Sequence, residues 1–298
     1  MANTDVGVAA GGLGKTIAAA IVQFNKAAVT PATISMAAAV KGSNTVQFPV
    51  YAKLVATAVT NEATGDEDTE EAATSITTAA TSVEVLRNHI NARVTDLAAY
   101  GNSDALMVNA GQDRGNAVAT EFDANICARF DAFATSKGTS TEGLRWIDIM
   151  DAVASLETND APRPYSAVLH PQQMYGSFGL SNELGQVAAV NGSNGAFGAG
   201  SSASEDFLQA GFVTSLAGIN FYTSPQVIDG SDGTEKKGAI YAKTALGCGY
   251  IDFGGGSFIE MRTERNELGA STNLVANGYW ASAELVDLHG VEIFTEIS

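Results

Sequence analysis

A long stretch with few large apolar side chains constrains the possible folds of this chain more than any other feature. It follows a strand-like segment, TVQFPVY (45–51), in which Pro49 favours an edge position. Limbs rich in Thr, Val and Ala flank an acidic tip, and alternating apolar residues at 83–94 predict a second strand. The sequence therefore predicts a long hairpin. Such a hairpin cannot bury enough surface to be stable alone, so we expect it to lie on a second copy of the chain.

The tip of this hairpin carries all of the candidate contact residues. Residues 60–74 contain six acids and no base. The spacing does not match a calcium-binding EF-hand loop, which leaves a solvated tip or a charge contact with a neighbouring subunit. The candidate inter-subunit contact residues are Lys53, near the start of the arm, and the acids Glu62, Asp66, Glu67, Asp68, Glu70 and Glu71.

Two amphipathic helices are expected after the hairpin. Residues 103–136 form the longer one, roughly 45 Å in length, which Lys137 and Gly138 would end. Residues 143–157 form the second. The apolar face of the long helix is predicted to hold Val118, Phe122, Ile126, Phe130 and Phe133. The apolar face of the second is predicted to hold Trp146, Ile147, Met150, Val153 and Leu156.

The remaining sequence predicts a mixture of strands, turns and one more helix. The expected elements are a buried strand at 166–171, a glycine-rich loop at 176–201, a helix near 205–216, a strand at 219–224, a turn at 229–238 and a strand at 239–242. From residue 249 onward, strands alternate with turns. The chain is therefore expected to have an α+β fold with a protruding arm.

Composition and motifs argue against an enzyme, a membrane protein and a DNA-binding protein. The formal net charge is −17, whereas binding to DNA phosphates needs a surplus of bases. No run of about 18 apolar residues is present. Cys127 and Cys248 stand outside any metal-binding pattern and are expected to be buried thiols. We find no catalytic triad, cofactor loop or set of metal ligands, and therefore expect a structural protein without a cofactor or metal.

Two glycine-rich motifs resemble nucleotide-binding loops only superficially. GGLGKT (11–16) lacks the first glycine of a phosphate-binding loop and does not follow a buried strand. Gly254–Gly256 lies between two strand-like segments, which favours a tight hairpin or a close backbone approach over dinucleotide binding.

The order of these segments resembles the tailed-bacteriophage major capsid family, which has the Hong Kong 97-type fold. TVQFPVY and the acidic hairpin resemble the N-terminal arm and the extended E-loop of that family. DALMVNAGQDRGNAVATEFDANICARF resembles its spine helix, SAVLHPQQMYG a strand ending in His-Pro, and LAGINFYTSPQV and AIYAKTALG later strands. The resemblance begins near residue 40, and its specificity comes from the order of the motifs.

The resemblance implies a domain organisation and a function. The expected ranges are an N-terminal arm (1–44), an E-loop hairpin with flanking strands (45–96), a peripheral (P) domain with the spine helix (97–160), an axial (A) domain (161–248) and return strands to the P domain (249–298). The implied function is self-assembly, through pentamers and hexamers, into an icosahedral head that encloses phage double-stranded DNA. The chain would be made in the host cytoplasm and reside in the virion.

The expected partners are further copies of the chain, a separate scaffolding protein, a portal and possible cement proteins. Some members of this family crosslink an E-loop lysine to a neighbouring subunit, but no acceptor can be aligned for Lys53. Three alternatives stay open: an encapsulin-like compartment shell, a tail or baseplate structural protein, and a nucleotide-binding protein that uses Lys15.

Overall fold

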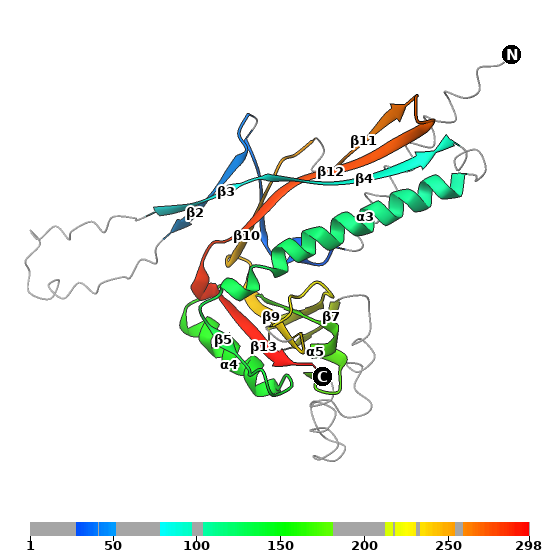
Figure 1. Ribbon diagram of the computed structural model, residues 1–298. Helices are drawn as coiled ribbons and strands as arrows, with labels where there is room; N and C mark the ends of the chain where they lie inside the picture. The colour runs from blue at the N-terminus through cyan, green and yellow to red at the C-terminus, as the bar shows by residue number, and fades with distance from the viewer. Residues whose placement is uncertain are drawn as a thin grey trace, which may run out of the picture.

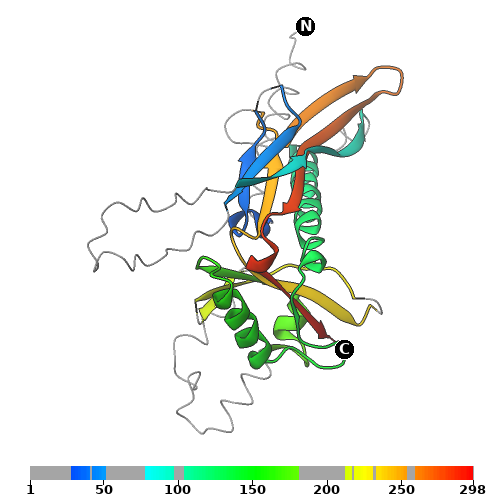
Figure 2. The same cartoon turned by 90° about the vertical axis from the view of Figure 1, so that its left-hand side faces the viewer.

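The computed structural model describes residues 28–40, 42–51, 78–96, 104–180, 212–216, 218–230, 233–253 and 259–297. An elongated upper body contains one sheet with a long helix beside it, and a compact lower body contains a second sheet (Figure 1). Figure 2 shows the long helix leading from the upper body toward the lower one. This mixture of helices and strands confirms the predicted α+β class.

The sheet of the upper body is organised around one long strand. Strand β12 pairs with β4 along one side, and with β11 and then β10 along the other. A short strand, β1, extends the sheet in parallel beside β10. The bounds are β1 (Ser35–Ala38), β4 (Leu86–Thr95), β10 (Leu246–Tyr250), β11 (Ile259–Asn266) and β12 (Ser271–Glu284). Gly254–Gly256 lies outside the described residues; the strands on either side of it, β10 and β11, pair with successive parts of β12.

The long helix α3 (Asp104–Cys127) packs its predicted apolar face on this sheet. Val118, Phe122 and Ile126 are all buried. Phe122 lies against Trp280 of β12, with 5.5 Å between the ring centroids. Burial of this stripe holds the helix along the sheet, as its spacing predicts.

The predicted end of the long helix at residue 136 is wrong. The α-helix ends at Cys127, and a 3-10 turn, η3 (Phe130–Ala132), follows it. Phe130 and Phe133 are buried as predicted, but they contact Tyr241 in the lower body, at centroid distances of 5.6 and 6.5 Å. A continuous helix would keep both phenylalanines beside the upper sheet, so their packing on Tyr241 explains why the chain turns here.

The lower body contains a six-stranded sheet in the order β5-β13-β9-β6-β8-β7. Its strands are β5 (Ser136–Lys137), β6 (Tyr165–Leu169), β7 (Phe212–Leu216), β8 (Ile219–Thr223), β9 (Glu235–Ala242) and β13 (Gly290–Glu296). Every residue of β6 is buried, as predicted for the 166–171 strand. The chain ends in this body, beside β13 (Figure 1). A short turn, η6 (Asp287–His289), leads into β13.

Two predictions in the lower body are wrong. Residues 212–216 form β7, which pairs with β8, and are not the end of a helix. The predicted turn at 229–238 is also too long, because β9 begins at Glu235 and pairs with β13 from that residue onward. In both places, pairing with a neighbouring strand overrides the local preference of the sequence.

Helix α4 (Trp146–Thr158) occurs near the predicted position, and Val153 and Leu156 are buried as predicted, but the rest of its buried face differs. Ile147 is 58% exposed and Met150 is 40% exposed, which contradicts their predicted core positions. The helix turns toward the sheet the side that carries Ile149, Ala152, Val153 and Leu156. This set follows the i, i+3, i+4, i+7 spacing of a helical face. A short helix, α5 (Pro171–Tyr175), follows β6.

The base of the predicted hairpin is a two-stranded ribbon of β2 (Thr45–Tyr51) and β3 (Thr78–Glu84). Its residues Val46, Phe48, Val83 and Val85 form a third core cluster with residues of β12, including Tyr279 and Ala281. The expected extent of the arm is therefore wrong. The ribbon packs on its own chain, and residues 86–95 form β4 of the upper sheet. The rest of the predicted hairpin, residues 52–77, lies outside the described residues.

The N-terminal segment joins the two bodies through buried polar contacts. The 3-10 turn η1 (Thr30–Ala32) lies against α3, where Asp123 accepts hydrogen bonds from the amides of Val29 and Thr30, both at 3.1 Å. The hydroxyl of Thr30 donates a third bond, at 2.6 Å. Thr33 hydrogen-bonds to the hydroxyl of Tyr241 on β9, at 2.7 Å. One short segment thus contacts both the spine of the upper body and the lower sheet.

The tight packing around Trp280 makes Gly278 sensitive to substitution. A Cβ atom at Gly278 would overlap the indole ring, which is almost completely buried. We expect Gly278→Ala to lower the free energy of unfolding by about 1–3 kcal/mol, because the ring must shift within a filled core. In Gly247→Ala the new Cβ meets only the end of the Leu285 side chain. Chemical denaturation should show the larger loss for Gly278→Ala; equal losses would contradict the described packing.

Candidate inter-subunit surface

The seven predicted contact residues lie outside the described residues, so their contacts stay a prediction. Lys53 and the six acids at 62–71 belong to the segment between β2 and β3. The structure describes only the two ends of this segment, where Tyr51 pairs with Thr78. The acidic segment is therefore connected to the described structure at the end of the β2–β3 ribbon where Tyr51 pairs with Thr78.

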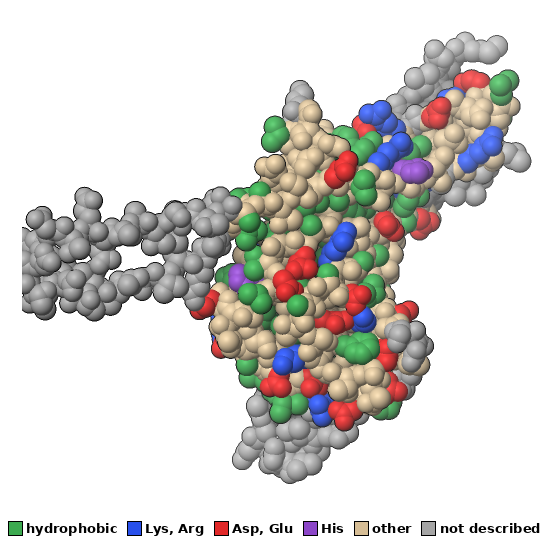
Figure 3. Space-filling view, turned by 60° about the vertical axis from the view of Figure 1, so that its left-hand side comes forward, with side chains coloured by type: hydrophobic (Ala, Val, Ile, Leu, Met, Phe, Trp, Pro, Cys, Tyr) green, Lys and Arg blue, Asp and Glu red, His purple; other side chains and the backbone are tan. Residues whose placement is uncertain are grey.

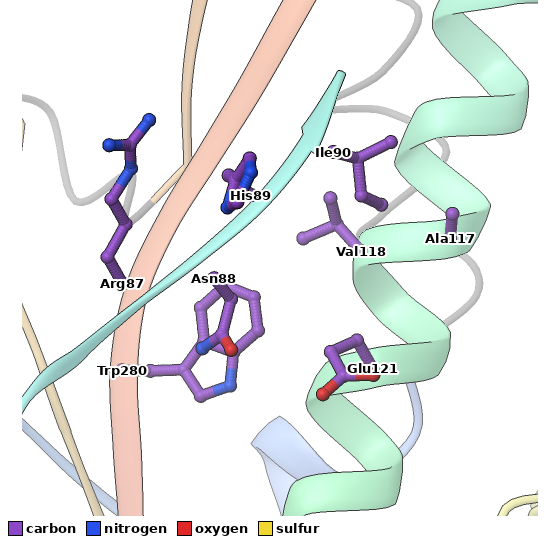
Figure 4. A pocket seen from close by; sticks show the side chains of 8 residues that line it. All are labelled: Arg87, Asn88, His89, Ile90, Ala117, Val118, Glu121 and Trp280. Atoms are coloured by element: carbon purple, nitrogen blue, oxygen red, sulfur yellow. The ribbon is translucent and has the colours of Figure 1, made fainter. Parts of the chain in front are cut away.

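A groove with a volume of about 310 Å³ lies between α3 and β4 (Figure 4). Ile90 of β4 points toward the helix beside Val118, while Arg87 points away from the helix. Trp280 and Glu121 complete opposite walls. The outer edge of β4 borders this groove, and edge strands are where an additional chain segment can pair.

The described residues offer little for catalysis. No group of three or more potential metal ligands occurs among them. Both cysteines are free and buried, as predicted. Burial raises the pKa of the Cys248 thiol to about 12 and raises that of Cys127 further, so both remain protonated and unreactive near neutral pH. In the described part of the chain, no helix is both long and apolar enough to cross a membrane.

The histidines near the lower sheet have local structural contacts. His170 accepts a hydrogen bond from the amide of Gln172 through Nδ1, at 3.2 Å, at the start of α5. His289 contacts the hydroxyl of Thr244 at 2.8 Å. Burial lowers the pKa of both imidazoles, which favours their neutral forms.

The side of the upper sheet that faces away from α3 carries a group of basic residues. Side chains alternate between the two faces of a strand, so Arg87, His89 and Arg93 of β4 point to the same side. Arg262 of β11 points to the same side. It pairs with Val275 of β12, Arg93 pairs with Asn273, and Val275 and Asn273 lie two residues apart on one face of β12. We call Arg87, His89, Arg93 and Arg262 the basic face, although Glu260 and Glu264 of β11 lie on the same side of the sheet. Figure 3 shows basic and histidine side chains gathered on the upper body.

Sequence reasoning missed this basic face, although part of its signal was present. Arg87, His89 and Arg93 are separated by even numbers of residues, which puts them on one face of a strand. Arg262 lies about 170 residues later in the chain, and only the shared pairing with β12 brings it to the same surface. The first three residues could have been grouped from the sequence, whereas the fourth required the topology.

An ion pair fixes the far corner of the same sheet. Arg265 of β11 reaches across the end of β12 and donates hydrogen bonds to the carboxylate of Asp96, which follows β4. The hydrogen bond from Arg265 lowers the pKa of Asp96 below its usual value. This pair contributes to stability above the ordinary pKa of an aspartate, and the contribution is lost as the pH falls through the lowered value.

Buried polar contacts also position the junction between the bodies. Burial raises the pKa of Asp123 on α3, although its three hydrogen bonds from Val29 and Thr30 act in the opposite direction. The carboxylate accepts donors that would otherwise be unpaired in the core. Asp123 therefore fixes the position at which the N-terminal segment contacts α3.

Comparisons with known proteins identify the fold. No family model matches the sequence, and neither does any curated protein. The structure resembles the capsid of Ralstonia phage GP4, with a TM-score of 0.66, 12% identity and 92% of each chain covered. It also resembles the capsid of cyanophage P-SCSP1u, with a TM-score of 0.64, 16% identity, and 92% of this chain and 89% of that one covered.

An encapsulin complex gives a similar match. The SrpI encapsulin complex of Synechococcus elongatus has a TM-score of 0.59 and 12% identity, with 89% of this chain and 86% of that one covered. These matches cover nearly the whole length of both chains in each pair. The chain therefore has the Hong Kong 97-type capsid fold.

Proposed function

We propose that the chain is the major capsid protein of a tailed bacteriophage and assembles into the icosahedral head that encloses double-stranded DNA. The supporting observation is the fold match, which covers 92% of this chain and 92% of the Ralstonia phage capsid subunit.

The fold suggests how neighbouring subunits contact each other. The upper body, with α3, would be the peripheral domain, and the lower body, with the six-stranded sheet, would be the axial domain around five- and six-fold axes. The predicted ranges were 1–44, 45–96, 97–160, 161–248 and 249–298. In the structure α4 and β13 pack with the lower sheet, so we propose to place both in the axial domain. The segment 52–77 would lie across the upper body of the next subunit.

A closed shell makes weak contacts sufficient. An exposed contact worth about 1 kcal/mol cannot hold two free proteins together, but a subunit in a shell makes several such contacts at once. Closed symmetry also means that every copy uses the same surfaces. The arm contact is therefore expected to control assembly without being a strong interface by itself.

The acidic composition suits a container for DNA. A formal net charge of −17 makes the chain repel a polyanion on average, so we propose that the shell encloses DNA without binding it tightly. We further propose that the chain is not an enzyme, needs no cofactor, and assembles in the host cytoplasm with a separate scaffolding protein and a portal. Cement proteins are possible additional partners of the outer surface in the virion.

An encapsulin-like shell is the second candidate, and the similarity to the SrpI encapsulin complex favours it. The two functions differ in what the shell contains. Shells formed with the other proteins of the source genome should contain double-stranded DNA if the chain is a phage capsid protein. Shells that instead retain a cargo protein and no DNA would favour the compartment.

Deletion of residues 60–74 tests the assembly role of the arm. We expect the deleted chain to remain folded, because the described cores lie outside this segment, but to form no normal shells. Electron microscopy would measure assembly and circular dichroism would measure folding, with the full-length chain as control. Normal shells from the deleted chain would contradict the proposed role of the arm.

A further inference from the structure

The short turn η6 lies where the chain passes from the upper body into the lower body. It follows β12 and leads into β13 (Figure 2). Two other connections also cross between the bodies: residues 128–135 join α3 to β5, and residues 243–245 join β9 to β10. Side chains of η6 bind both of these connections. The turn is therefore a place where the position of one body relative to the other can be fixed.

Asp287 and His289 make these contacts. The carboxylate of Asp287 accepts a hydrogen bond from the amide of Ala134, at 2.8 Å. Nδ1 of His289 shares a hydrogen bond with the hydroxyl of Thr244, also at 2.8 Å. The three crossings are thus joined to one another through two titratable side chains.

A second carboxyl group contacts Asp287. Glu284, the last residue of β12, is hydrogen-bonded to Asp287 through its side chain. Ionised carboxylates have only acceptor oxygens, so this hydrogen bond exists only when one member of the pair carries a proton. Burial and, after it, the neighbouring Asp287 raise the pKa of Glu284 above its usual value. Glu284 is therefore the member that takes up the proton.

Other charges on the elements that meet here do not bind this pair. These groups are Arg129, Asp131, Glu157, Asp160, Lys243 and His289. Arg129 hydrogen-bonds instead to the hydroxyl of Ser282, at 3.1 Å, and within the described residues neither Arg129 nor Lys243 forms an ion pair with Glu284 or Asp287. His289 responds to acid in the opposite direction, because burial lowers its pKa and favours the neutral ring. Its protonation loosens the turn, whereas protonation of Glu284 tightens it.

We infer that Glu284 and Asp287 form a proton-operated latch between the two bodies. When Glu284 binds a proton, its hydroxyl donates to the carboxylate of Asp287, which can still accept from the amide of Ala134. When Glu284 releases the proton, two negative carboxylates face each other, and their repulsion weakens the contact of Asp287 with Ala134. This inference goes beyond the proposed function, because it concerns the subunit itself, whatever a shell of such subunits encloses.

The latch is expected to be stronger in mild acid. A carboxyl group whose pKa is higher in the folded protein than in the unfolded chain binds its proton more tightly when folded. The contribution of Glu284 is therefore fully present below the ordinary pKa of a glutamate, and it is lost as the pH rises through the raised value. The Arg265–Asp96 ion pair has the opposite dependence, but it weakens only below the ordinary pKa of an aspartate.

Hydrogen–deuterium exchange of the dilute, unassembled full-length chain tests the latch at about pH 8 and about pH 4.5, with exchange times scaled for the intrinsic effect of pH. The amides of Ala134 and of residues 285–290 should be at least about twofold more protected in mild acid, because opening of the turn must then break the bond between Glu284 and Asp287. Equal protection at both pH values would overturn the latch, as would lower protection in acid, which is the effect expected from His289.

The variant Glu284→Gln provides a second readout. Its side-chain amide can donate to Asp287 at every pH, so the same backbone amides should be protected equally at both pH values. Glu264→Gln removes an exposed carboxylate from β11 and is the matched control, which should keep the pH dependence of the wild type. His289→Gln should keep it as well. A wild-type response in Glu284→Gln, or its loss in His289→Gln, would exclude the latch, and the wild-type measurement stands whether or not a variant folds.

Discussion

Replacing Trp280 by alanine is expected to lower the free energy of unfolding by about 3–5 kcal/mol. The indole is 1% exposed and lies between β12 and α3, with its ring centroid 5.5 Å from that of Phe122. Alanine would remove these contacts and leave a cavity that the strand and helix cannot fill by small shifts. Urea denaturation of the unassembled chain, followed by circular dichroism, measures the loss.

Leu268 provides the control for Trp280. It lies fully exposed in the turn between β11 and β12, so Leu268→Ala is expected to change the free energy of unfolding by less than about 0.5 kcal/mol. A similar effect of the two substitutions would contradict the packing of the spine helix on the upper sheet.

Replacing Asp123 by alanine is expected to lower the free energy of unfolding by about 3 kcal/mol. The carboxylate is 3% exposed and accepts hydrogen bonds from the amides of Val29 and Thr30 and from the Thr30 hydroxyl. Its removal leaves two buried donors and one partly buried donor without this partner, and each unpaired buried group costs about 1–3 kcal/mol before the structure relaxes. Limited proteolysis should also cut the chain near residue 28 faster.

Two further substitutions separate the hydrogen-bonding role of Asp123 from a general effect of charge. Asp123→Asn retains one acceptor oxygen and should lose less stability than Asp123→Ala. Asp113→Ala removes an exposed carboxylate from the same helix and should have an effect within about 0.5 kcal/mol. If Asp123→Ala is no more harmful than Asp113→Ala, the N-terminal segment is not anchored as described.

The sequence predicts the elements whose patterns are local. The stripe of Val118, Phe122 and Ile126 repeats at helical spacing, and the helix forms there. TVQFPVY becomes β2 without a shift at either end, and the buried strand near 166–171 becomes β6. In these segments the local preference and the tertiary environment agree, which is why pattern reasoning succeeds.

The errors occur where distant residues decide the local structure. Phe130 and Phe133 fit the stripe of α3, but Tyr241 in the lower sheet provides their packing partner, so the helix ends before them. Residues 86–95 were assigned to the hairpin, because nothing local shows that β12 will pair with them about 180 residues later. In α4, two adjacent apolar faces compete, and only the position of the sheet selects the one with Ile149.

The sequence indicates the chemistry of the candidate surface but not its location in the fold. The acidic run at 62–71 is evident in the sequence, which leaves open whether it is solvated or contacts a neighbouring subunit. The basic face combines β4 with Arg262 of β11, and the register of both strands against β12 creates it. A surface assembled from remote strands leaves no contiguous motif.

Electron microscopy of the purified full-length chain at high concentration tests most directly whether this molecule is a shell subunit. The proposed function predicts closed, single-layered particles built from rings of five and six subunits. A population that remains monomeric at every concentration and salt level, with no curved sheets or shells, would contradict the account.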